Sequence, residues 1–188
     1  MAKAKVREKY RGLSRQELMD KAYELAVDFE KNNFCCSQAP VAALHELLEI
    51  DDVVVKVSTS LSGGTAEQFT GTCGPLVGGL MVLGYFFGRP VEKLSFTERK
   101  QSNVDALFET FPAPQALAEK YWQEYGTILC PHIQRKLFGR TWWLLDADDL
   151  AKFEEAGGHS DPSKCCHVIG TAARWVMEIL LDKGAVEL

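Results

Sequence analysis

Residues 69–88 carry no charged side chain, and this run restricts the fold more than any other part of the sequence. An uncharged run of this length either spans a membrane or lies inside a protein core. The run contains six glycines, and Pro75 leaves only about thirteen residues of continuous helix before Gly88, whereas a bilayer requires roughly 20. We therefore predict a buried central helix over residues 75–87 and no membrane span.

The rest of the chain also has a helical pattern. Residues 14–17 form a capping box, and apolar residues then recur at spacings of three and four, which is the helical period. The valine-rich residues 53–57 favour a short strand, with an Asp-capped helix as the alternative. Further helices are predicted from about residue 37 to before 51, from a second capping box at 95–98 onwards, and over 116–125, 131–138, 148–155 and 165–183.

These elements predict the fold class and the domain organisation. The expected fold is all-α: a multi-helix bundle with glycine-rich loops at helix starts. No repeat, linker or low-complexity tract divides the chain, so we expect one helical domain over residues 1–188, with a basic N-terminal tail at 1–12.

Composition excludes several classes of protein. The chain has a net charge of −5 and no basic stripe beyond its first eleven residues, which argues against nucleic-acid binding. No apolar segment follows the basic start, so we expect no secretory signal and a cytoplasmic location. Thiols stay reduced in that compartment, and six cysteines therefore indicate metal or redox chemistry more than structural disulfides.

Four of the six cysteines lie where a helix is predicted to begin: Cys36, Cys73, Cys130 and Cys165. A thiol at a helix start faces unpaired backbone N–H groups and the positive end of the helix dipole, which favour the metal-binding thiolate. If the four converge, they form an anionic metal or iron–sulfur site. Their spacings of 37, 57 and 35 residues match no zinc-finger or ferredoxin motif, and inert core thiols are the alternative.

The segments around these cysteines resemble those of one known family. They are residues 36–39 (CSQA), 72–81 (TCGPLVGGLM) after Gly63-Gly64, 125–130 (YGTILC) before Leu137-Phe138-Gly139, and Cys165 with Ile169 and Ala172-Ala173. In this order they are similar to the four cysteine motifs of the C-GCAxxG-C-C family of redox-active proteins, over about residues 20–183. The chain departs from that pattern at Pro75, where the family has alanine, and in its extra cysteines, Cys35 and Cys166.

The resemblance implies a mostly helical, cysteine-ligated redox protein with an iron–sulfur centre, found near transporters and oxidoreductases. We predict a cluster held by the four helix-start cysteines, with [2Fe–2S] as first choice because four thiolates on separate helices fit Cys₄ ligation. The predicted role is electron transfer or redox sensing with a redox partner protein or oxidoreductase complex, rather than that of a stand-alone enzyme. The alternatives are a structural zinc-binding protein with the same ligands, and a metal-free thiol/disulfide oxidoreductase using pairs such as Cys35–Cys36 and Cys165–Cys166.

Several other residues have two interpretations each. The extra cysteines either pack beside the site or enlarge the thiolate set, and His132 and His167 are either hydrogen-bonded histidines or Rieske-type ligands. His45 is expected to be structural, and His159 lies in a glycine loop. The apolar run 142–145 is expected to cover the core; alternatively it is the contact of a homodimer or of an accessory subunit.

Overall fold

A capping box starts the first helix in the computed structural model, which describes residues 3–188. Ser14 Oγ accepts a hydrogen bond from the Glu17 N–H (3.3 Å), and the Glu17 carboxylate accepts one from the Ser14 N–H (2.7 Å). These bonds satisfy two N–H groups that the helix itself leaves unpaired. The helix, α1 (Arg15–Asn33), ends at Phe34, which has a left-handed backbone conformation.

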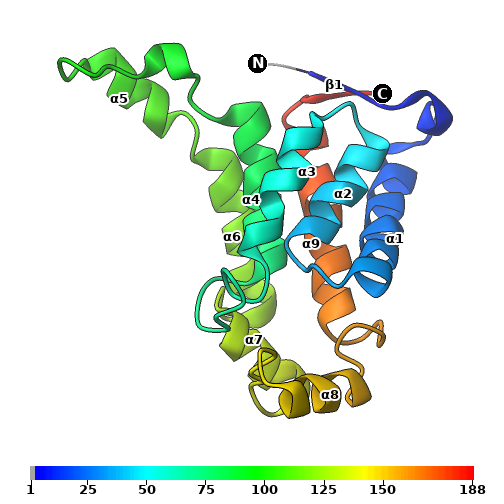
Figure 1. Cartoon of the computed structure of the whole chain (residues 1–188). Coiled ribbons are helices and arrows are strands. Elements are labelled where there is room, and N and C mark those ends of the chain that lie inside the picture. Colours follow the sequence, from blue (N-terminus) through cyan, green and yellow to red (C-terminus); the bar gives the residue numbers. More distant parts are fainter. Residues whose placement is uncertain (1–2) are drawn as a thin grey trace.

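Five longer helices form the bundle, and the final helix lies at its centre (Figure 1). They are α1, α2 (Gln38–Leu47), α4 (Gly74–Phe87), α6 (Pro112–Tyr125) and α9 (Cys165–Asp182). Helix α9 packs against all four others. Its apolar stripe, including Ile169, Val176 and Leu180, is almost fully buried, because it is enclosed by neighbours on several sides. The all-α fold class is therefore confirmed.

The uncharged run of the sequence forms α4 and the glycine-rich loop before it. Helix α4 packs against α2, α3 (Asp52–Ser58), α6 and α9. Leu76, Val82 and Leu83 are buried, whereas Gly84 and Tyr85 on the same helix are exposed. Across the described residues, none of the helices combines the length and the hydropathy that crossing a membrane requires.

Two glycines of α4 give a matched pair of substitutions. A Cβ atom at Gly78 would lie 2.1 Å from the Ser37 carbonyl oxygen, whereas one at Gly84 would have no neighbour within 4 Å. We expect Gly78→Ala to destabilise the fold by about 1–3 kcal/mol, because the backbone at Ser37, just before α2, must move. Gly84→Ala should stabilise it by about 0.5–1 kcal/mol, because alanine favours a helix more than glycine does. Urea unfolding of both variants measures the difference, and equal midpoints would contradict close packing at Gly78.

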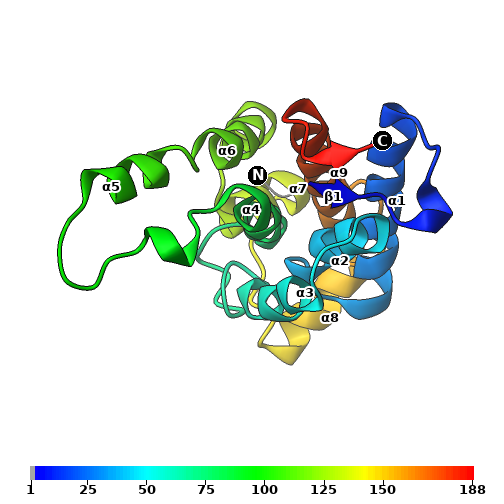
Figure 2. The same ribbon diagram turned by 90° about the horizontal axis from the view of Figure 1, so that it is seen from above.

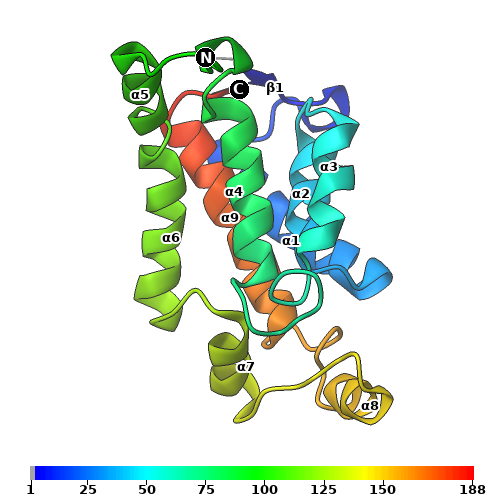
Figure 3. The same cartoon turned by 60° about the vertical axis from the view of Figure 1, so that its left-hand side comes forward.

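Four of the shorter elements lie at the two ends of the bundle. Helices α7 (Cys130–Phe138) and α8 (Ala147–Glu155) lie together at one end (Figure 3). At the other end β1 (Ala4–Lys5) pairs in parallel with β2 (Val186–Glu187), close to both termini (Figure 2). Ala4 is buried in this contact, so the basic N-terminal segment, expected as a tail, joins the fold from Ala4 onwards.

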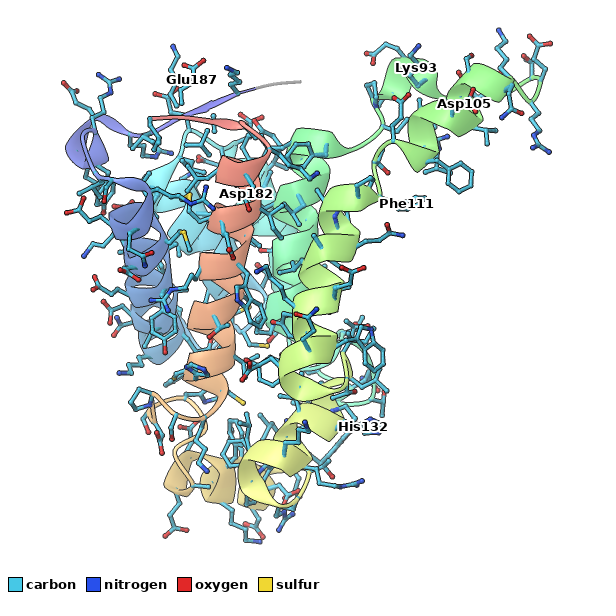
Figure 4. All side chains as sticks on the ribbon, turned by 180° about the vertical axis from the view of Figure 1, so that it is seen from behind. Lys93, Asp105, Phe111, His132, Asp182 and Glu187 are labelled. Carbon is cyan, nitrogen blue, oxygen red and sulfur yellow. The ribbon has the colours of Figure 1, made fainter. Side chains whose placement is uncertain are left out.

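Two local predictions need correction. Residues 53–57 belong to α3, so the helical alternative holds and the strand does not. The second capping box starts no helix, although Ser95 Oγ accepts a bond from the Glu98 N–H (3.4 Å); the next helix is α5 (Gln101–Phe108). The described residues 88–111 project from the bundle and none is buried, so no packing supports an earlier helix start (Figure 4).

Candidate metal centre

The four helix-start cysteines line a single cavity of about 600 Å³, to which α7 and α8 also contribute lining residues. Cys73 is the residue before α4, and Cys130 and Cys165 are the first residues of α7 and α9. Cys36 lies in the turn that leads into α2. Successive cysteines of this set are 35 to 57 residues apart in the sequence. The four helix starts thus bring them to one cavity.

A short backbone ladder holds two of these helix starts side by side. The Cys73 N–H donates to the Ile128 carbonyl (2.8 Å), and the Cys130 N–H donates to the Gly71 carbonyl (2.9 Å). Thr72 and Leu129 form the antiparallel bridge between them. Both backbone segments are extended immediately before their helices, so the two cysteines enter the cavity from adjacent positions.

The glycine-rich loop before α4 holds the thiol of Cys36. The Gly63 N–H donates to Cys36 Sγ (3.4 Å), and Ser62 Oγ lies 3.5 Å from the same sulfur. Gly63 has a φ of +58°, a conformation that favours glycine. Gly74 provides the space for the thiol, because a Cβ atom there would lie 2.4 Å from Cys36 Sγ.

Burial has the largest effect on the pKa values of the four thiols. It raises the pKa of Cys130 to about 12, with the Glu67 charge adding to the effect, and it raises the pKa of Cys73 and Cys165 well above the ordinary value. Burial also raises the pKa of Cys36, with Glu30 adding to it. The sequence argument expected helix starts to favour thiolate, and in the fold desolvation outweighs that effect. A metal would therefore have to displace the protons of neutral thiols.

The donor set that the four cysteines form consists of sulfur alone. Four sulfur ligands suit soft metals such as those of iron–sulfur clusters and zinc. Within residues 3–188, no three His, Cys, Asp or Glu side chains are already arranged around one ion-sized point. The thiols instead line a cavity much wider than one ion, which leaves space for a group of several atoms.

Sequence reasoning missed a carboxylate in the same cavity. Glu30 is 1% exposed and lines the cavity, and within residues 3–188 neither of its oxygens has a hydrogen-bond partner. Burial, with the charge of Glu67 adding to it, raises its pKa to about 8. The signal was in the helical period of α1, because Glu30 continues the stripe of Leu18, Ala22 and Ala26 at a spacing of four.

The histidine that lines the cavity is not one of the two that the sequence singled out as possible ligands. His159, next to a glycine pair, lines the cavity, whereas His132 and His167 do not. His132 lies on the outer side of α7, with Nδ1 3.4 Å from Thr127 Oγ1 (Figure 4). His167 Nδ1 lies 3.0 Å from the Tyr23 hydroxyl, so its ring has a partner outside the cavity.

The extra cysteines do not line the cavity either. Cys35 Sγ lies 3.8 Å from the Thr59 carbonyl oxygen. Cys166 is fully buried, and burial raises its pKa to about 11. Each member of an adjacent pair thus has a different environment, because successive residues at a helix start point in different directions.

The apolar run 142–145 is divided between core and surface. Trp142 is buried, and its indole packs against Phe138 and Phe153. Leu144 lines the cysteine cavity, whereas Trp143 and Leu145 are 43% and 58% exposed. The run therefore covers the core, as expected, and also leaves two apolar side chains at the surface beside the cavity.

Comparison with known proteins gives one match. A family model described as "Putative redox-active protein (C_GCAxxG_C_C)" matches residues 34–179, which is more than three quarters of the 188 residues and includes all four cavity cysteines. Searches of curated proteins and of solved structures gave no significant match.

Proposed function

We propose, because this chain belongs to the C_GCAxxG_C_C family of redox-active proteins, that its cysteine cavity binds an iron–sulfur cluster used in electron transfer or redox sensing. The ligands would be Cys36, Cys73, Cys130 and Cys165, with [2Fe–2S] as the first choice. A single observation carries the proposal: these cysteines, from four different helix starts, line one cavity.

The groups around the thiols would tune such a cluster. When bound, the cluster would supply the ability to take up and release single electrons. Hydrogen bonds to ligand sulfurs raise a cluster's reduction potential, and Cys36 accepts one from the Gly63 N–H while Cys130 accepts one from the Gln134 amide (3.8 Å). The walls of the same space include the apolar side chains of Phe69 and Phe153, which would limit the contact of a cluster with water.

The partner in this proposal is a redox protein or an oxidoreductase complex that docks near the cavity. Trp143 and Leu145 are the exposed apolar side chains next to α8, which covers one side of the site. Aromatic residues are enriched in protein interfaces, so this surface is the proposed contact for the partner or for a second copy of the chain.

Metal and sulfide analysis of the protein, purified without oxygen, tests the function. We expect a coloured protein with iron and acid-labile sulfide in similar amounts, and bleaching on reduction. Zinc without sulfide would instead indicate a structural zinc protein. A metal-free protein whose thiols oxidise and reduce reversibly would indicate a thiol/disulfide oxidoreductase.

A further inference from the structure

We propose that Glu30 and His159 form a second metal-binding position in the wall of the cysteine cavity, for a divalent transition-metal ion. This position is separate from the four thiols, and the inference does not depend on what those thiols bind. It rests on three features: a buried carboxylate without a partner, the geometry of a histidine beside it, and the charges of the cavity.

The first feature is the environment of Glu30. Its two carboxyl oxygens are inaccessible to solvent, and within residues 3–188 neither has a partner in good hydrogen-bond geometry, although the nearby Cys35 N–H favours the charged form. A buried carboxylate in this state is strongly unfavourable unless it is neutral or bound to a cation. Of the described residues that line the cavity, none is lysine or arginine, and Glu67 and Glu154 add further negative charge. Among these lining residues His159 can supply a positive charge only when it is protonated, so beside a neutral His159 a cation for Glu30 would come from outside the chain.

The second feature is the distance between Glu30 and His159. Glu30 Oε1 lies 3.7 Å from His159 Nε2, which is too long for a hydrogen bond. Two ligands of one tetrahedral ion, each at about 2.1 Å from the metal, lie roughly 3.4 Å apart. A shift of a few tenths of an ångström would therefore let one ion bind both atoms.

The third feature is the support behind His159. Its Nδ1 bonds to the Glu154 carboxylate, which leaves Nε2 free to bind a metal. A carboxylate behind a ligating histidine is the usual arrangement at metal sites, because it fixes the tautomer and the ring orientation. Phe34 and Phe153 pack against the ring with centroid distances of 4.8 and 5.0 Å, so the imidazole is also held by packing.

These ligands define the class of ion. One imidazole nitrogen and one carboxylate oxygen suit divalent ions such as Zn²⁺, Fe²⁺ and Co²⁺. Two protein ligands leave the other coordination positions to water, and an open position is typical of metal sites that bind substrates. The cavity would then combine a thiol-rich wall with an exchangeable metal position.

Titration of the full-length protein with Co²⁺ tests the proposal. The iron and sulfide content of the protein is measured first. Co²⁺ bound by nitrogen and oxygen lacks the intense sulfur-to-cobalt charge-transfer band, so the spectrum distinguishes this position from the thiols. We expect one equivalent to bind without that band. Glu154→Gln should weaken binding by about 10–100-fold, and Glu30→Gln and His159→Gln should each weaken it further.

The control is His132→Gln, because His132 lies outside the cavity and should leave Co²⁺ affinity unchanged. If Glu30→Gln fails to fold, the variants at the half-buried His159 and Glu154 still test the proposal. Equal affinity in the wild type and both ligand variants, or uptake only with the sulfur band, would overturn the proposal. A protein without iron or sulfide that still binds Co²⁺ through Glu30 would support it while contradicting the cluster.

Discussion

Serine substitution at Cys36, Cys73, Cys130 or Cys165 is expected to remove most of the bound metal from this protein. Each change deletes one proposed sulfur ligand from the cavity wall. The loss of metal affinity should exceed the roughly 10–100-fold that removal of an outer-shell partner costs. Iron and sulfide analysis, together with visible absorption, measures the loss for each of the four variants.

The chain offers a matched control next to one proposed ligand. Cys35 precedes Cys36 directly, is half-buried, and does not line the cavity. Cys35→Ser should therefore keep its iron and sulfide, as should Cys166→Ser if it folds. Loss of metal in Cys35→Ser would show that the ligand set is larger than the four cavity cysteines. Full metal content in Cys73→Ser would exclude Cys73 as a ligand.

The helices that could be predicted are those stabilised by local signals and by one apolar face. The capping box at Ser14, proline after Cys130, and glycines at the ends of α6 and α7 all mark helix boundaries within a few residues. The capping box at Ser95 starts no helix, because a cap contributes only about 1 kcal/mol and none of the described residues 88–111 is buried in the core. The parallel pairing of β1 with β2 depends on contacts between the two ends of the chain, which no local pattern encodes.

The candidate site could be predicted only in part, because local patterns do not encode contacts between distant segments. Each cysteine stood at a local helix-start signal, so the thiols could be named from the sequence. Their surroundings depend on packing between distant segments, which decides that Glu30 and His159 face the cavity while His132 does not. Desolvation also depends on that packing, and it reversed the expected direction of the thiol pKa shifts.

Removing the metal should lower stability and change how stability depends on pH. If free metal exceeds its Kd about a thousandfold, binding contributes about 4 kcal/mol, or roughly 10 °C in melting temperature for a chain of this size. Metal binds the thiolate form, so the stability that it contributes is lost as pH falls. Thermal unfolding of the loaded and the chelator-treated protein between pH 6 and roughly pH 10 measures both effects.

The metal-free protein should show the opposite dependence. Its buried thiols have raised pKa values in the fold, whereas an unfolded thiol ionises near about pH 8.5. The stability from keeping them neutral is complete below that pH and is lost as pH rises above it, by about 1.4 kcal/mol per pH unit for each thiol. Metal-free Cys73→Ser has one such thiol fewer and should therefore lose stability less steeply above about pH 9. Equal slopes in the wild type and this variant would mean that Cys73 is not desolvated in the metal-free fold.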